Sequence, residues 1–193
     1  KPASSNNSYW SKLTMAVNEQ TLFSADHSGT LVALEVDTGR QQWSVDLDLP
    51  ISGGLGYGDQ KVVLGTIEGQ VYTLNAQDGS VLWSSSVSSE VLSTPSVNSD
   101  IVVAQSIDNR IYAFDAETGE ELWQHDAGAP ILSVRGNSSS MILNNMVIAA
   151  FDNGKLTAFN SENGSLIWET RLAVPKGRTA LALVIDIGGV PNW

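Results

Sequence analysis

Four segments of the chain share one pattern of apolar and polar positions and align without gaps. Each segment has an apolar strand, a polar turn with glycine at a fixed place, and a second short strand that ends at tryptophan. The segments run from Thr30 to Trp43, Gln70 to Trp83, Arg110 to Trp123 and Lys155 to Trp168. This pattern predicts four β-hairpins, because apolar and β-branched residues favour strands and glycine favours the tight turn between them.

A second set of apolar runs lies upstream of the four hairpins. Each of these runs leads into a short turn, such as Asp108-Asn109, whose residues tolerate a positive φ angle. A further strand is expected to begin after each of the first three hairpins, at Ile51, Val91 and Ile131. Each unit would then contain four short antiparallel strands. The upstream runs cover residues 21–25, 62–66, 101–105 and 146–150.

The spacing of the hairpin tryptophans defines the architecture. They are 40, 40 and 45 residues apart, and a period of this length with four strands per unit is typical of a β-propeller blade. Because one four-stranded sheet cannot cover both its faces alone, blades pack against each other around an axis. We therefore expect an all-β propeller of four-stranded antiparallel blades, with each tryptophan filling the wide outer gap between two blades. The turn glycines are expected to adopt left-handed geometry and not to form calcium loops.

Composition and charge narrow the possible functions. The chain has 193 residues, of which 42% are hydrophobic and 16% charged, as expected of a packed globular body. Its 21 acidic residues against 10 Lys and Arg give a formal net charge of −11, which disfavours nucleic acid and anionic membranes as partners. The absence of Cys excludes disulfides and thiolate chemistry, and two distant His residues argue against a metal centre.

The repeat unit resembles the propeller repeat of pyrroloquinoline-quinone proteins, as in Val71-YTLNAQDGSVL-Trp83. That repeat occurs in quinone-dependent dehydrogenases, which bind the quinone and Ca²⁺, and also in non-catalytic propellers that bind other proteins. The repeat alone leaves both classes open. The known dehydrogenases usually have a vicinal Cys pair near the quinone, so the absence of Cys and about half the expected length weigh against this alternative.

Two further segments resemble those of the BamB family, propeller lipoproteins of the machinery that assembles outer-membrane β-barrels. The family has a Leu-Ser-Leu-Arg-Gly type segment after the third repeat, and here the sequence reads Leu132-Ser-Val-Arg-Gly136. After the fourth repeat the family has an Asp-x-Asp-Gly-x-Pro type segment, and here it reads Asp186-Ile-Gly-Gly-Val-Pro191. The first segment is a close match. The second departs from the family pattern, because Gly188 stands where the family has its later aspartate.

The resemblance implies a non-catalytic scaffold at the periplasmic face of the outer membrane, held there by a lipid on an amino-terminal Cys. Its implied partners are the POTRA domains of the barrel subunit, BamA, and also unfolded outer-membrane proteins; no cofactor and no metal are expected. The contact residues carried over from the family are Leu132, Val134, Arg135 and Asp186. An Arg beside apolar residues suits this role, because it can pair with a carboxylate while its neighbours bury surface. The alternative is structural. Arg135 would form a salt bridge to a neighbouring blade, Leu132 and Val134 would be ordinary inward-facing strand residues, and Asp186 would be a solvated turn carboxylate.

The number of repeats bears on closure of the ring. The chain has about four repeats, whereas the family resemblance implies eight blades. Residues 1–193 are therefore expected to be a single β-propeller domain or the amino-terminal half of one. The second alternative, half of an eight-bladed ring, is the more economical. An open half would expose the apolar faces of its end blades and favour self-association.

Overall fold

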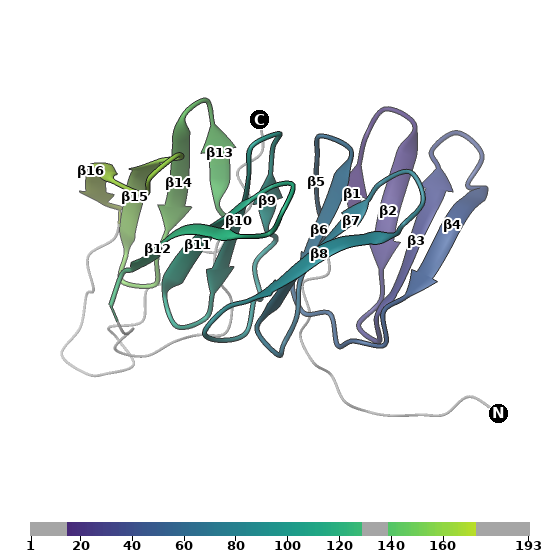
Figure 1. The fold of residues 1–193 in the computed structure, drawn as a ribbon, viewed down its shortest axis with the longest axis horizontal. Coiled ribbons are helices and arrows are strands. Elements are labelled where there is room, and N and C mark those ends of the chain that lie inside the picture. The colour runs from purple at the N-terminus through teal and green to yellow at the C-terminus, as the bar shows by residue number, and fades with distance from the viewer. Residues whose placement is uncertain (1–14, 129–138, 173–193) are drawn as a thin grey trace.

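The computed structural model describes residues 15–128 and 139–172. Within these residues the chain forms sixteen β-strands, which group into four antiparallel sheets of four strands each. The sheets stand side by side in chain order, from β1–β4 at one end to β13–β16 at the other (Figure 1). The predicted all-β architecture of four-stranded blades is confirmed. No helix in the described ranges is long and apolar enough to cross a membrane.

Each blade consists of four consecutive strands that pair in chain order. Blade 1 contains β1 (Ala16–Val17), β2 (Thr21–Ala25), β3 (Thr30–Glu35) and β4 (Gln41–Asp46). Blade 2 contains β5 (Gly56–Gly58), β6 (Lys61–Gly65), β7 (Gln70–Asn75) and β8 (Val81–Ser86). Blade 3 contains β9 (Ser96–Val97), β10 (Ile101–Ser106), β11 (Arg110–Asp115) and β12 (Glu121–Asp126). Blade 4 contains β13 (Met141–Leu143), β14 (Met146–Ala150), β15 (Lys155–Asn160) and β16 (Leu166–Arg171). The short first strands of neighbouring blades contact each other. The four blades therefore form an arc, with these first strands on its inner side.

The predicted hairpins and upstream runs correspond to the second, third and fourth strands of each blade. The predicted start of the first strands was wrong. Ile51 forms only an isolated bridge to Thr66, and the first strands of blades 2 and 3 begin at Gly56 and Ser96. Ile51 and Val91 are instead buried along the path by which the chain returns from the outer strand to the inside of the next blade. Their apolar character reflects this burial and not strand pairing; the third predicted start, Ile131, lies outside the described residues.

The hydrophobic core is divided into three clusters, one in each junction between neighbouring blades. Strand β6 shows how a blade serves two junctions, because Val62 and Leu64 join the cluster with blade 1 whereas Val63 joins the cluster with blade 3. All three side chains are fully buried. Burial of such a side chain contributes about 1.5–3 kcal/mol. The strands are therefore apolar on both faces because both faces are covered.

Tryptophan fills the outer part of each junction, as predicted, and also makes a hydrogen bond there. In each case the indole N–H donates to a backbone carbonyl of the next blade. The bonds run from Trp43 to Ala76 at 3.0 Å, from Trp83 to Ala116 at 3.0 Å and from Trp123 to Ser161 at 2.8 Å. The next blade also presents its turn glycine beneath the ring: a Cβ on Gly119 would lie 2.6 Å from Trp83. With a φ of +73°, Gly119 also has the left-handed geometry that its turn requires.

Candidate functional site

The four residues predicted to contact a partner lie outside the described residues. Leu132, Val134 and Arg135 fall in residues 129–138, and Asp186 falls in residues 173–193. The structure does describe the points at which the first of these segments leaves blade 3 and enters blade 4. These anchor points form the candidate site.

The connection that carries residues 129–138 is longer than its two counterparts. The chain crosses from blade 1 to blade 2 in residues 47–55 and from blade 2 to blade 3 in residues 87–95, nine residues each. The crossing from blade 3 to blade 4 takes the fourteen residues 127–140. Because all three connections join the same positions of successive blades, the third has five more residues than this step needs. A long connection on a repetitive scaffold is a common place for function.

At its exit from blade 3 the connection is held at two consecutive residues. The N–H of Ala127 donates to the carbonyl of Asn109 at 3.0 Å, and the N–H of Gly128 donates to Oδ1 of Asp126 at 2.8 Å. Gly128 has a φ of +89°, so the chain turns sharply there. The hydrogen bond from Gly128 is the main cause that lowers the pKa of the Asp126 carboxyl; burial opposes it and the Arg110 guanidinium adds to it. The exit is therefore a charge-assisted turn.

Asn109 holds this exit with its side chain. Its Nδ2 donates to the carbonyl of Gly128 at 3.1 Å, and its Oδ1 accepts the N–H of Asp152 in blade 4 at 3.4 Å. The residue is fully buried and has a φ of +64°. A second amide assists, because Nδ2 of Asn153 donates to the carbonyl of Ala127 at 3.2 Å. The base of the connection is thus tied to blade 3 and blade 4 at once.

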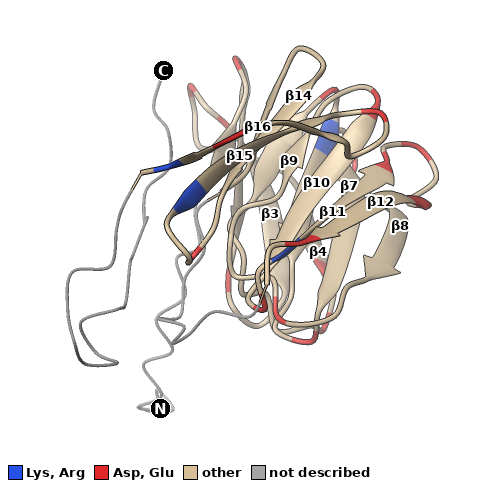
Figure 2. Cartoon of the chain, turned by 90° about the vertical axis from the view of Figure 1, so that its left-hand side faces the viewer, with Lys and Arg blue, Asp and Glu red and all other residues tan. Residues whose placement is uncertain are grey.

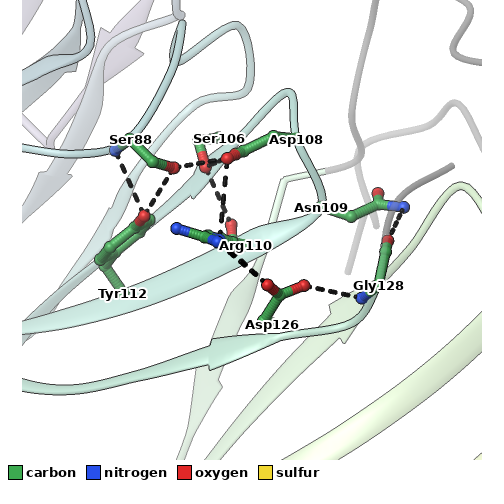
Figure 3. Close-up of polar contacts among 8 residues, drawn as sticks. All are labelled: Ser88, Ser106, Asp108, Asn109, Arg110, Tyr112, Asp126 and Gly128. Atoms are coloured by element: carbon green, nitrogen blue, oxygen red, sulfur yellow. Dashed lines mark hydrogen bonds and ion pairs between the residues drawn. The ribbon is translucent and has the colours of Figure 1, made fainter.

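A polar network beside the exit also holds the preceding connection (Figure 3). The Tyr112 hydroxyl donates to Oγ of Ser88 at 2.7 Å. The Ser88 hydroxyl in turn donates to Oδ2 of Asp108 at 2.6 Å. The Arg110 guanidinium lies between two carboxylates, with Nη2 at 3.1 Å from Oδ2 of Asp126 and Nε at 3.8 Å from Oδ2 of Asp108. One turn, between β10 and β11, therefore anchors the second and third connections together.

The other end of the connection is anchored at the inner side of the arc. The Oγ of Ser96, in β9, donates to the carbonyl of Ser140, immediately before β13. Ser140 is buried. Both ends of the connection are thus held against blade 3, which favours a defined placement of its base.

The surface around the blades is acidic. Asp and Glu gather at the turns and strand ends, whereas the few Lys and Arg are scattered (Figure 2). The basic side chains of Arg40, Lys61, Arg110 and Lys155 are each paired with carboxylates. Lys61 is buried and pairs with Asp59 in its own blade and Glu117 in the next. Across the described ranges, no three His, Asp or Glu side chains converge so as to hold a metal ion.

The role of Asn109 was not predicted from the sequence, although a signal for it was present. Gly29, Gly69 and Gly154 occupy the corresponding turn positions, where their carbonyls accept the N–H that follows the fourth strand of each blade. Asparagine stands at this position only in the third repeat. A polar residue that replaces glycine at one of four equivalent turns, next to the longest connection, indicates a side-chain role at that turn.

The fold and its repeated tryptophan junctions define the chain as a β-propeller of the pyrroloquinoline-quinone repeat type. Among solved structures, BamB from Moraxella catarrhalis matches 82% of this chain and 48% of its own chain, with a TM-score of 0.74 and 24% identity. A computationally designed protein, Ika8, matches 81% of this chain and 48% of its own, with a TM-score of 0.67 and 19% identity. At these identities the two structures support the fold alone.

The sequence comparisons identify the family. A family model described as outer membrane protein assembly factor BamB matches residues 27–192, so the chain belongs to this family. The outer membrane protein assembly factor BamB of Pseudomonas aeruginosa is 52% identical over 92% of this chain, and that of Kangiella koreensis is 45% identical over 94%. This chain spans about half the length of these relatives, 47% in both cases.

Proposed function

We propose that the chain is part of a non-catalytic scaffold for the assembly and insertion of outer-membrane β-barrel proteins, which binds the POTRA domains of the barrel subunit, BamA. The observation that carries this proposal is membership of a family whose relatives are named outer membrane protein assembly factors. The dehydrogenase alternative is not favoured, because those relatives are named as assembly factors and not as oxidoreductases.

The proposed contact is the segment between blades 3 and 4, with Leu132, Val134 and Arg135 as its contact residues and Asp186 as a further one. The extra length of this connection and its tied base support the choice. Arg135 is the one charged residue between Asp126 and Asp152 in a chain with a net charge of −11. An isolated cation among apolar neighbours suits a partner surface that offers a carboxylate within an apolar patch.

The proposal extends to location and to the whole protein. The full-length protein works at the periplasmic face of the outer membrane, where a lipid anchors it, and unfolded outer-membrane proteins are a further partner class. The names of the relatives support the outer-membrane setting. The acidic surface of the blades fits a protein-binding role better than one on nucleic acid or anionic lipid.

We also propose that residues 1–193 are the amino-terminal half of an eight-bladed ring. The share of the relatives that this chain spans supports this, as do the end faces of the part that the structure describes: Trp168 is 37% exposed, and apart from its chain neighbours no described residue lies within 4 Å of a Cβ on Gly39. Sedimentation velocity tests the idea on the isolated chain. We expect concentration-dependent self-association through the apolar end faces. A monodisperse monomer at every concentration would contradict the half-ring.

The contact segment is tested by the affinity of the full-length protein for purified BamA POTRA domains. Arg135→Glu is expected to weaken binding about 30-fold, or about 2 kcal/mol, because it replaces a paired cation with a repelled anion. Arg40→Glu is the matched control, since it makes the same change of charge on an exposed side chain of blade 1. Equal effects of the two variants, or none from Arg135→Glu in a folded protein, would remove the contact assignment. Quinone and Ca²⁺ binding without POTRA binding would instead favour the dehydrogenase class.

A further inference from the structure

We propose that Asn109 is a positioning residue: its buried side chain sets the direction in which the connection between blades 3 and 4 leaves the scaffold. This inference rests on the proposed function, in which that connection carries the partner contacts. Asn109 itself lies wholly within the described residues and is far too buried to touch a partner.

The first two blades show what glycine does at this turn position. A Cβ on Gly29 would lie 2.7 Å from the backbone N and O of Leu49, and one on Gly69 would lie 2.9 Å from the carbonyl oxygen of Ser89. In both blades the returning connection therefore runs directly over the turn, in space that a side chain would need. Glycine at these two positions permits the close approach of two backbones.

Asn109 changes this arrangement while keeping the backbone geometry. Its φ of +64° is close to the +74° of Gly69, and its carbonyl accepts the same N–H that follows the fourth strand. An asparagine side chain cannot occupy the turn if a backbone runs over it as at Leu49. It instead meets the carbonyl of Gly128 at 3.1 Å, at the last described residue before the long segment. At the turn position where Gly29 and Gly69 have no side chain, Asn109 thus supplies a specific hydrogen bond to the connection.

The Asn109 side chain is fixed relative to two blades, because its Oδ1 also accepts the N–H of Asp152 in blade 4. A buried amide with donor and acceptor both engaged has one orientation, so the hydrogen bond to Gly128 has a defined direction. A connection that begins from a fixed direction loses less conformational freedom when a partner binds. Asn109 therefore favours binding without contributing to the interface.

The test uses Asn109→Gly, which restores the residue of the other three turns and accepts a positive φ. Hydrogen exchange of the full-length protein without partner is the first readout. We expect amide exchange in residues 127–140 to be several-fold faster, and tryptic cleavage after Arg135 to be about fivefold faster, while exchange in β10 and β11 is unchanged. Asn153→Ala is the comparison variant: it removes the second amide bond at the exit, to Ala127, together with the bond from the Lys155 N–H, and leaves the one to Gly128, so it should accelerate exchange in residues 127–140 less than Asn109→Gly does.

The second readout is affinity for the POTRA domains. It is expected to fall about three- to tenfold in Asn109→Gly, because the connection then loses more conformational freedom when the partner binds. Unchanged exchange and cleavage around residues 127–140 would overturn the positioning role. General loosening of β10 and β11 would do so too, because it would mark a structural role in the whole blade. These outcomes are separate from a failure of the proposed function, in which Arg135→Glu leaves binding intact while Asn109→Gly still accelerates exchange.

Discussion

The interior junctions of the arc and its two end faces are built from the same repeat, yet only the interior ones are complete. Trp83 and Trp123 are 8% exposed and bond to the next blade, whereas Trp168 is 37% exposed and finds no acceptor within the described ranges. The glycines show the same contrast. A Cβ on Gly119 would meet the Trp83 ring, but among residues 15–128 and 139–172 one on Gly39 would meet nothing within 4 Å beyond its chain neighbours.

This difference shows that the repeat encodes two half-interfaces on opposite faces of one blade. One face supplies the indole and its N–H, and the other supplies a turn glycine with a carbonyl three residues before it, as in Ala116 and Gly119. Neither half stabilises the blade that carries it unless a neighbour supplies the other half. Stability is therefore a sum of neighbour contacts, and identical motifs have different energetic weight at different places.

The largest expected effect compares Trp83→Ala with Trp168→Ala in the 193-residue chain, at concentrations low enough for the chain to be monomeric. Truncation of Trp83 should lower the free energy of unfolding by about 3–5 kcal/mol, because it opens a cavity in a filled junction and leaves the Ala116 carbonyl without its donor. Truncation of Trp168 should lower it by about 1 kcal/mol or less, since this residue is already 37% exposed, against 8% for Trp83. Urea denaturation followed by circular dichroism measures both.

A longer protein containing the remaining blades sharpens the same comparison. If a fifth blade covers Trp168, its truncation should become as destabilising there as that of Trp83. Equal effects already in the 193-residue chain would contradict the account of complete and incomplete junctions.

A smaller effect is expected from Gly119→Ala and Gly39→Ala. Both glycines have a positive φ, +73° and +68°, so each alanine carries a strain of about 1–2 kcal/mol. At Gly119 the new methyl group also collides with the Trp83 ring, which adds about 1–3 kcal/mol. Thermal unfolding should therefore show a clearly lower midpoint for Gly119→Ala. If the two variants had the same melting temperature, backbone strain alone would explain the need for glycine, and the close packing against tryptophan would not contribute to stability.

Much of the fold could be predicted because the propeller repeats its local signals. The pattern from Gln70 to Trp83 contains strand, turn and junction residue at once, and four copies of it remove the ambiguity of a single short apolar run. The error at Ile51 and Val91 has a physical cause. A buried residue in an irregular return path and a buried residue in a strand are both apolar, and the sequence pattern alone does not separate them.

The candidate site was less accessible to prediction. Arg135 and its neighbours were chosen by resemblance to a family segment, and they lie outside the described residues. The anchor at Asn109 depends on where the chain leaves Gly128, which is a tertiary relation between residues 19 positions apart. Local sequence could indicate that Asn109 favours a positive φ, but not what its amide would meet.

The smallest expected effect concerns the pH dependence of two equivalent hairpin turns. In blade 3, Asp115 accepts the N–H of Thr118 at 2.8 Å and that of Glu117 at 3.0 Å; in blade 2, Asn75 accepts the N–H of Gln77 at 2.8 Å. The bonds from Thr118, first its N–H and then its hydroxyl, lower the pKa of the Asp115 carboxyl below its ordinary value of 3.8. The folded state therefore binds this proton more weakly than the unfolded state. The resulting stability is present above about pH 4 and is lost as the pH falls through the lower, folded pKa.

Asp115→Asn keeps the acceptor of the turn but removes its titration, as the asparagine of blade 2 does naturally. The melting temperature at pH 7 should change by less than about 2 °C, whereas the fall in melting temperature between pH 4 and pH 2 should become shallower. Asn75→Asp is the reciprocal variant and should make that fall steeper, because it adds a carboxyl whose charged form accepts the N–H of Gln77. Thermal scans of the three proteins across this range separate the two cases. Parallel pH profiles would mean that these turn carboxylates are as protonated in the folded chain as in the unfolded one.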